Sequence, residues 1–317
     1  MKSRRAFLLE PHQMEIREVE VAPGPGEIMV KVAVCGLCNW ELNHWHGILG
    51  TPPQPLGHEW AGEVVALGEG IEDIALGAQV TGFATGQIGF SDYLTSPQGS
   101  YFQLAPTVNP TDALGEPLAC VTNVLRATEP QAGDFGVILG CGPMGLWCTQ
   151  VLSGHLLAGL IAVDTQDWRL DLARKFGATH TINPKTEDAE ARLAEITGGH
   201  SADFVIEGTG VPAVIAQAAS YLRRGQGRLS IMSSHEEGGP AFDWRPIIGK
   251  GIQIRGTHPA WAPSMQEELR RAVLLLNQGV FQMEGVITHR FPLADAQEAM
   301  EALENKPEGF LKGVIVP

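Results

Sequence analysis

The stretch Val137-Ile-Leu-Gly140-Cys-Gly142-Pro-Met-Gly145 decides the fold of this chain. A short apolar run leads into three glycines with the spacing Gly-x-Gly-x-x-Gly, and a helical pattern follows. In such a strand–turn–helix the first glycine makes the tight turn, the second lets the backbone approach a pyrophosphate, and the third lets helix and strand pack closely. The helix N-terminus supplies N–H donors to phosphate. We therefore expect a dinucleotide to be bound by Gly140, Gly142, Pro143, Met144 and Gly145.

An acidic residue lies where the next strand of the pattern ends. Residues 160–163 are typical of a buried strand, and Asp164 follows them directly. A carboxylate at this place accepts hydrogen bonds from ribose hydroxyls and repels a 2′-phosphate, which favours NAD over NADP. Arg169 is a further candidate for the cofactor, although its spacing also suits the adjoining helix. A plain turn at the glycines and a helix cap at Asp164 are the alternatives.

Strands and helices alternate from about residue 122 onward. This alternation predicts an α/β fold with a doubly wound parallel sheet and right-handed crossovers. The first third is richer in β-branched residues bounded by Gly and Pro turns, which indicates a β-rich domain. A last strand at 313–316 is expected to return to that domain. We therefore expect a discontinuous catalytic domain, 1–122 and 258–317, and a nucleotide domain, 123–257. The expected strands are 19–21, 27–34, 63–67, 136–139, 160–163, 204–206, 228–232 and 252–255, and the expected helices are 145–154, 167–176, 211–222, 264–278 and 293–304.

The composition limits the classes of function. A chain of 317 residues suits two domains. Its 22 basic and 36 acidic residues give 22 − 36 = −14, which argues against binding nucleic acid or an anionic membrane. We find no apolar run near the roughly 20 residues of a membrane-spanning helix, and the apolar run after the basic start is too short for a signal peptide. Five cysteines without framework spacing indicate a reducing compartment, so we expect a soluble cytoplasmic protein.

A second informative stretch, Gly57-His58-Glu59, follows Cys38 by twenty residues. Cys, His and Glu are side chains that bind zinc in open catalytic sites, where a position stays free for water or substrate. A buried thiol and a hydrogen-bonded core imidazole are the alternatives. Cys35 and Cys38 form a Cys-x-x-Cys that occurs once, so a four-cysteine zinc site cannot be assembled, and Cys35 is expected to be a packed thiol.

Over nearly its whole length the chain resembles the medium-chain, zinc-dependent alcohol and polyol dehydrogenases. The motifs that carry the resemblance are Val34-Cys-Gly36-Leu-Cys38, Gly57-His-Glu59-x-x-Gly62-x-Val64-x-x-x-Gly68, Gly89-Phe-Ser-Asp-Tyr93, Glu116-Pro-Leu118, the glycine motif, Glu207-Gly-Thr-Gly210 and Ile287-Thr-His-Arg-Phe-Pro292. The resemblance implies a Rossmann domain, a GroES-like catalytic domain, NAD, one catalytic Zn²⁺ and a homodimer or homotetramer. The structural zinc lobe of the family needs four clustered cysteines, and there are none between Phe83 and Glu116.

By that resemblance Cys38 and His58 are two zinc ligands. Glu59 is either a third ligand or a carboxylate that contacts the ligands without binding the metal. Glu116 stands where polyol and sugar dehydrogenases place a glutamate at the metal. One thiolate and two carboxylates on Zn²⁺ would leave the centre at net −1 and weaken its Lewis acidity. We therefore expect one of the two glutamates to bind the metal through water. The sequence leaves open whether Glu59 or Glu116 is the direct ligand.

The chain departs from the family pattern after Cys38. Trp40 stands where a Ser or Thr usually relays the substrate proton, and an indole is a donor only. His44 or His46 could take the relay, or water could, or the chemistry differs; His44 is our candidate, against the alternative of an exposed loop histidine without function. Glu41 replaces an Asp and is expected to orient a ligand with a longer arm.

Together these features predict hydride transfer between a secondary alcohol and NAD, with a polyol, cyclitol or sugar hydroxyl favoured. The expected catalytic residues are Cys38, His58, Glu59, Glu41 and His44. A dehydrogenase of a hydrophobic secondary alcohol, an epimerase or lyase acting through a transient ketone, and a non-catalytic binding protein are the alternatives. Trp40 and Trp60 line either the substrate pocket or the core.

Overall fold

The computed structural model describes residues 1–83, 86–233 and 244–317. The fold divides into two compact units, Met1–Ala119 with Gln266–Pro317, and Cys120–Met265. The first unit is therefore built from both ends of the chain, and the second from its middle. The divisions predicted from the sequence fall after residues 122 and 257.

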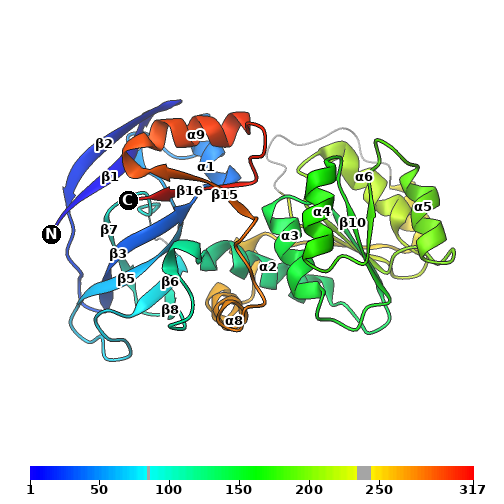
Figure 1. Ribbon diagram of the computed structural model, residues 1–317, viewed down its shortest axis with the longest axis horizontal. Coiled ribbons are helices and arrows are strands. Elements are labelled where there is room, and N and C mark those ends of the chain that lie inside the picture. The colour runs from blue at the N-terminus through cyan, green and yellow to red at the C-terminus, as the bar shows by residue number, and fades with distance from the viewer. Residues whose placement is uncertain (84–85, 234–243) are drawn as a thin grey trace. The chain divides into compact units, whose positions relative to one another are not determined.

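The second unit contains a six-stranded sheet in the order β11-β10-β9-β12-β13-β14, and every neighbouring pair is parallel (Figure 1). This is the strand order of the doubly wound dinucleotide-binding fold, so the predicted α/β class is confirmed. Its strands are β9 (Phe135–Leu139), β10 (Gly159–Val163), β11 (His180–Ile182), β12 (Phe204–Glu207), β13 (Arg228–Ile231) and β14 (Gln253–Gly256).

Helices connect these strands, as crossovers between parallel strands require. α3 packs against α4, and α5 and α7 pack against α6. Apolar residues of β9, β10 and β12 form one core with residues of α5 and α6. The helices are α3 (Pro143–Leu152), α4 (Asp167–Lys175), α5 (Ala189–Ile196), α6 (Pro212–Tyr221) and α7 (Arg245–Lys250), with a 3-10 turn η2 (Pro259–Trp261).

The first unit is β-rich and contains two sheets. One has seven strands, in the order β15-β16-β3-β5-β6-β8 with β7 also paired to β3, and the other has the order β2-β1-β4. The C-terminal strand β16 pairs antiparallel with β3, as the sequence predicts. The strands are β1 (Lys2–Glu10), β2 (Gln13–Glu20), β3 (Glu27–Gly36), β4 (Gln54–Pro55), β5 (Glu59–Leu67), β6 (Gln79–Phe83), β7 (Tyr93–Pro97), β8 (Tyr101–Gln103), β15 (Ile287–Pro292) and β16 (Lys312–Val316).

Helices pack on these sheets and close the core of the first unit. α9 contacts β16, β15, β2 and α1, which Figure 1 shows beside one another. The core includes both Trp45 and Trp60, so Trp60 packs in the core and does not line an open pocket. The helices with residues in this unit are α1 (Asn39–Trp45), α2 (Gly115–Thr128), whose residues 120–128 belong to the second unit, α8 (Met265–Asn277), whose first residue does, and α9 (Ala296–Asn305), with 3-10 turns η1 (Pro110–Asp112) and η3 (Leu293–Asp295).

No helix within the described ranges combines the length and the apolar character needed to cross a membrane.

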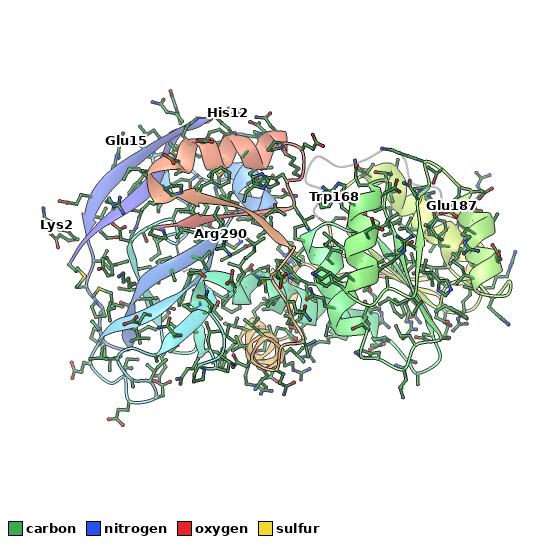
Figure 2. The ribbon with its side chains drawn as sticks, in the orientation of Figure 1. Lys2, His12, Glu15, Trp168, Glu187 and Arg290 are labelled. Carbon is green, nitrogen blue, oxygen red and sulfur yellow. The ribbon has the colours of Figure 1, made fainter. Side chains whose placement is uncertain are left out.

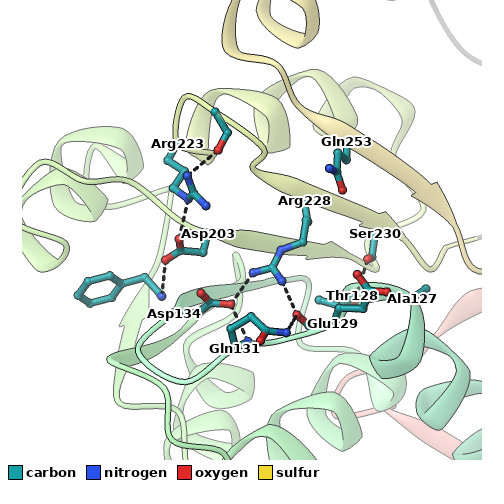
Figure 3. Close-up of polar contacts among 12 residues, drawn as sticks. Ala127, Thr128, Glu129, Gln131, Asp134, Asp203, Arg223, Arg228, Ser230 and Gln253 are labelled. Atoms are coloured by element: carbon teal, nitrogen blue, oxygen red, sulfur yellow. Dashed lines mark hydrogen bonds and ion pairs between the residues drawn. The ribbon is translucent and has the colours of Figure 1, made fainter.

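Charged side chains tie the strands of the second unit together at the start of its central strands (Figure 3). The Arg228 guanidinium on β13 donates to the Asp134 carboxylate and to the carbonyl of Glu129. Asp203 accepts from Arg223 at 2.6 Å and from the backbone N–H of Phe135 at 2.8 Å. The side chains of Arg228 and Asp134 are only 11% and 12% exposed, so each charge depends on its partner.

We expect Asp134→Ala to lower the free energy of unfolding by about 3 kcal/mol, because it leaves the buried Arg228 charge unpaired. The double variant Asp134→Ala/Arg228→Met removes both charges and should recover most of that loss. Denaturant unfolding of the variants measures both effects. Arg192→Met, which removes an exposed ion pair with Glu195, is the control and should leave the midpoint unchanged. Equal losses in the single and double variants would contradict the pairing.

Candidate metal centre and dinucleotide site

Cys38 lies at the junction between β3 and α1. The backbone is extended at Cys38, and the thiol accepts from the N–H of Trp40 at 3.5 Å. The Glu41 carboxylate accepts from the backbone N–H of Cys38 at 3.0 Å, which completes a reciprocal cap of the helix. The same local structure that begins α1 therefore fixes the position of the thiol.

The second oxygen of Glu41 orients His58. Glu41 Oε1 lies 2.5 Å from His58 Nδ1, and the Glu41 side chain is fully buried. His58 Nε2 then faces Glu116, with 3.9 Å to Glu116 Oε2. Carboxylates that hold the far nitrogen of a histidine are typical of metal sites, because they fix the ring and its tautomer. Glu41 thus connects Cys38 and His58 through one side chain.

Glu59, the first residue of β5, is buried and forms an ion pair with Lys312 of β16. Lys312 Nζ lies 2.9 Å from Glu59 Oε1 and 2.6 Å from Oε2. Gly36, which pairs with Glu59 across the sheet, leaves room for this carboxylate, because a Cβ there would lie 1.9 Å from Glu59 Oε2. Burial opposes the charge on Lys312, but the Glu59 carboxylate together with Cys38 and Glu41 outweighs it, so the pKa of Lys312 is raised.

Glu116 reaches the site from the first turn of α2. The helix begins at Gly115, whose N–H donates to Thr81 Oγ1 on β6 at 2.9 Å. Thr81 in turn donates to the carbonyl of Trp60 at 2.8 Å. A Cβ at Gly115 would lie 2.6 Å from the Thr81 methyl, so glycine allows this close contact. The start of α2 is therefore anchored to the strand pair next to His58.

Two groups of potential ligands share His58. Cys38, Glu41 and His58 form one, and His58, Glu59 and Glu116 form the other, each with ligand atoms within 4.8 Å of one another. Burial and the Glu59 carboxylate raise the pKa of the Cys38 thiol. Burial opposes the charge on His58, but the carboxylates of Glu41 and Glu116 help to raise its pKa well above the ordinary value. The Lys312 ammonium and the His58 imidazole thus lie among three carboxylates and the Cys38 thiol. The imidazole, carboxylates and thiol form a donor set that fits a divalent cation such as zinc.

His44 and Trp40 lie on the same short helix. His44 is buried, unlike the exposed loop histidine of the alternative interpretation. Its Nδ1 lies 3.1 Å from the carbonyl of Leu49, and its Nε2 has no hydrogen-bond partner among the described residues. The two rings meet edge to face at 6.2 Å. The relay role of His44 stays a prediction.

The glycine motif forms the turn between β9 and α3. Gly140 has φ +98°, and a Cβ at Gly145 would lie 2.0 Å from the Gly140 carbonyl oxygen, so both positions require glycine. A Cβ at Gly142 would meet none of the described atoms within 4 Å. Pro143 is the first residue of α3 and Met144 the second, and within the described chain no side chain caps this helix. The open turn and the helix N-terminus fit a pyrophosphate.

Asp164 lies at the end of β10, beside this turn. Its carboxylate accepts from the N–H of Cys141 at 2.7 Å and from the N–H of Gln166 at 2.9 Å. The side chain is thereby held next to the glycine motif, and its oxygens retain lone pairs for further donors. Arg169 belongs to α4, and its guanidinium lies over the ring of Trp168, 5.1 Å from the centroid. The cofactor contact predicted for Arg169 stays a prediction.

Lys312 was missed in the sequence, and Gly36 was noted only as part of the motif around Cys38, without the space that it leaves for Glu59. The predicted last strand began at residue 313, one residue after the lysine. A single lysine at the edge of an apolar strand, Lys312–Val316, was the available signal. Its partner Glu59 lies 253 residues earlier, so the pairing has no local signature.

We expect Glu41→Gln to weaken zinc binding by about 10- to 100-fold. Glutamine has one acceptor oxygen, so it cannot serve both Cys38 N–H and His58 Nδ1–H. Competition for zinc with a chromophoric chelator measures the change. Glu63→Gln alters an exposed glutamate of the same β5 strand and should bind zinc like the original protein. Equal affinity in both variants would refute the orienting role of Glu41.

Comparisons with known proteins show the family of this chain. The zinc-binding dehydrogenase family profile matches residues 143–276, and the alcohol dehydrogenase GroES-like domain profile matches residues 24–114. An L-threonine 3-dehydrogenase of Pyrococcus horikoshii is 30% identical over 92% of this chain and 91% of its own length. A (R,R)-butanediol dehydrogenase of Bacillus subtilis is 30% identical over 86% of this chain and 88% of its own.

A solved structure shows the same fold. The structure of a putative zinc-binding dehydrogenase from Sinorhizobium meliloti bound to NADP superposes with a TM-score of 0.90 at 27% identity, covering 100% of both chains. Motifs, sheet order, ligand geometry and relatives all point to one family. The chain belongs to the zinc-type medium-chain dehydrogenases, the alcohol and polyol dehydrogenases that work by hydride transfer.

Proposed function

We propose that the protein oxidises a secondary hydroxyl of a polyol, cyclitol or sugar with NAD⁺, using one zinc ion held by Cys38, His58 and Glu116. The observation that carries the proposal is the orientation of His58, whose Nδ1 is bonded to Glu41 and whose Nε2 faces Glu116. When bound, zinc would lower the pKa of the substrate hydroxyl, and the nicotinamide would accept the hydride.

The ion pair of Glu59 with Lys312 supports Glu116 as the third ligand. Lys312 neutralises Glu59 within the buried part of the site. A site with the Cys38 thiolate, neutral His58 and the Glu116 carboxylate would balance the charge of Zn²⁺. Recruiting Glu59 as well would give net −1 and separate Glu59 from its buried cation, which is costly.

The relatives support the substrate class. The names of two relatives specify L-threonine and (R,R)-butanediol as substrates. Both molecules carry a secondary hydroxyl beside a second polar group, as polyols and sugars do. Glu116 in Glu-Pro-Leu, by the resemblance to polyol dehydrogenases, favours the same class. Trp40 supports a second candidate, an epimerase or lyase, because an indole cannot accept and pass on the substrate proton.

We expect zinc-loaded protein to form NADH with at least one member of a panel of polyols, cyclitols, sugars and secondary alcohols. Cys38→Ala should abolish turnover and lose zinc. Cys35→Ala removes the neighbouring buried thiol and should retain both. Absorbance at 340 nm measures turnover, and product analysis detects epimers. Epimer formation without net NADH would replace the dehydrogenase with the second candidate, and turnover in Cys38→Ala would remove zinc from the proposal.

We propose NAD as the cofactor, supported by the Asp164 carboxylate beside the glycine motif. Asp164→Asn keeps an acceptor for the Cys141 N–H but removes the charge that would repel a 2′-phosphate. The ratio of kcat/KM for NADP⁺ to that for NAD⁺ should rise about tenfold, as for loss of one like-charge contact of roughly 1.4 kcal/mol. Asp167→Asn, three residues on, should leave the ratio unchanged. A preference of the original protein for NADP⁺ would contradict the assignment.

We propose that the protein is a homo-oligomer that associates through β14. This strand forms an edge of the six-stranded sheet, and Ile254 on it is 36% exposed. Trp261, shortly after it, is 87% exposed. Edge strands offer unpaired backbone groups to a second copy. Light scattering after size exclusion should give a molar mass that is a multiple of 34.0 kDa. Ile254→Lys should lower this mass, whereas Leu156→Lys, at another exposed site, should leave it unchanged. A monomeric original protein would refute this.

A further inference from the structure

A second group of metal-binding side chains lies on the surface of the first unit. His12 occupies the turn between β1 and β2 (Figure 2), His46 is the C-cap of α1, and Glu304 belongs to the last turn of α9. Their side chains are 53%, 36% and 32% exposed, so solvent and ions reach them. One potential ligand atom from each lies within 4.8 Å of the other two.

The distances between these atoms suit a small cation. His46 Nε2 lies 2.6 Å from Glu304 Oε1, and His12 Nδ1 lies 3.9 Å from Glu304 Oε2. The two imidazole centroids are 5.4 Å apart. Ligand atoms at typical zinc distances of about 2.1 Å in a tetrahedron are about 3.4 Å from one another. The two measured nitrogen–oxygen distances, one to each oxygen of Glu304, lie on either side of that value.

Neighbouring groups hold these ligands in place. The buried indole of Trp45 donates from Nε1 to Glu304 Oε2 at 3.1 Å. The backbone N–H of His12 donates to the carbonyl of Trp45 at 3.1 Å, and Gln297 Nε2 donates to the carbonyl of His12 at 3.1 Å. Outer hydrogen bonds of this kind orient ligands and raise metal affinity. The site is thus built from three chain segments fixed on one buried tryptophan.

We propose that His12, His46 and Glu304 bind a second divalent metal ion of the zinc or nickel type. Imidazole nitrogens suit these metals, and one carboxylate adds charge to the two neutral rings. The ion leaves a coordination position open to solvent. Its binding connects the β1–β2 turn to α1 and α9, and so to the end of the helix that begins after Cys38. This site shares no residue with the centre at His58.

Zinc stoichiometry tests the site. Equilibrium dialysis against buffered micromolar Zn²⁺ should give two ions per chain for the original protein, and one for His12→Asn or His46→Gln. Asparagine tolerates the φ of +65° at position 12, so that variant removes the ring without straining the turn. His200→Asn, which removes an exposed histidine of the other unit, should keep two ions. One ion per chain in the original protein, or two in both site variants, would overturn the proposal.

A thermal readout is independent of stoichiometry and of activity. Addition of Ni²⁺ to protein that carries one equivalent of zinc, enough for the centre at His58 only, should raise Tm, because a ligand that binds only the folded state stabilises it. Glu304→Gln keeps an oxygen for the Trp45 indole but loses the carboxylate charge, and it should need about tenfold more Ni²⁺ for the same rise. An identical Ni²⁺ dependence in this variant would overturn the assignment of Glu304.

Discussion

Two buried carboxylates, Glu41 and Glu59, constrain the rest of the metal centre. A buried carboxylate is costly unless hydrogen-bond donors or a cation surround it. Glu41 meets this requirement with the Cys38 N–H and His58 Nδ1, and Glu59 meets it with Lys312. The first set connects α1 to the start of β5, and the second connects β5 to β16. The neutralisation of two buried charges therefore connects α1, β5 and β16 at this centre.

This division of partners also separates the roles of the carboxylates. Both oxygens of Glu41 accept from donors on the protein, and both oxygens of Glu59 face Lys312. Glu116 approaches from a different element, at the N-terminus of α2, within 3.9 Å of His58 Nε2. The proposed ligand set follows from the buried ion pair that holds Glu59 and from the position of Glu116 beside His58 Nε2. Because the thiolate and one carboxylate balance Zn²⁺, the proposed centre stays neutral and keeps its Lewis acidity.

Local patterns made much of the fold predictable. The glycine motif and the alternation after it predicted the parallel sheet, because turn glycines and apolar strands are short-range signals. Helix α1 was missed, because its N-cap is Cys38, and helix starts are sought at Ser, Thr, Asp and Asn. His44 belongs to this helix and is buried, so the alternative that placed it in an exposed loop was wrong. Lys312 could not be predicted as a partner of Glu59, because only the folded sheet brings strands so distant in sequence together.

The most direct test of the account compares zinc binding by two variants with altered carboxylates. Glu59→Gln/Lys312→Met removes the buried ion pair as a unit, and Glu116→Gln removes only the proposed third ligand. We predict that Glu116→Gln weakens zinc binding at least about tenfold, whereas the double variant stays within about threefold of the original protein. Loss of zinc from the double variant together with full retention in Glu116→Gln would contradict the account, because Glu59 would then be the ligand.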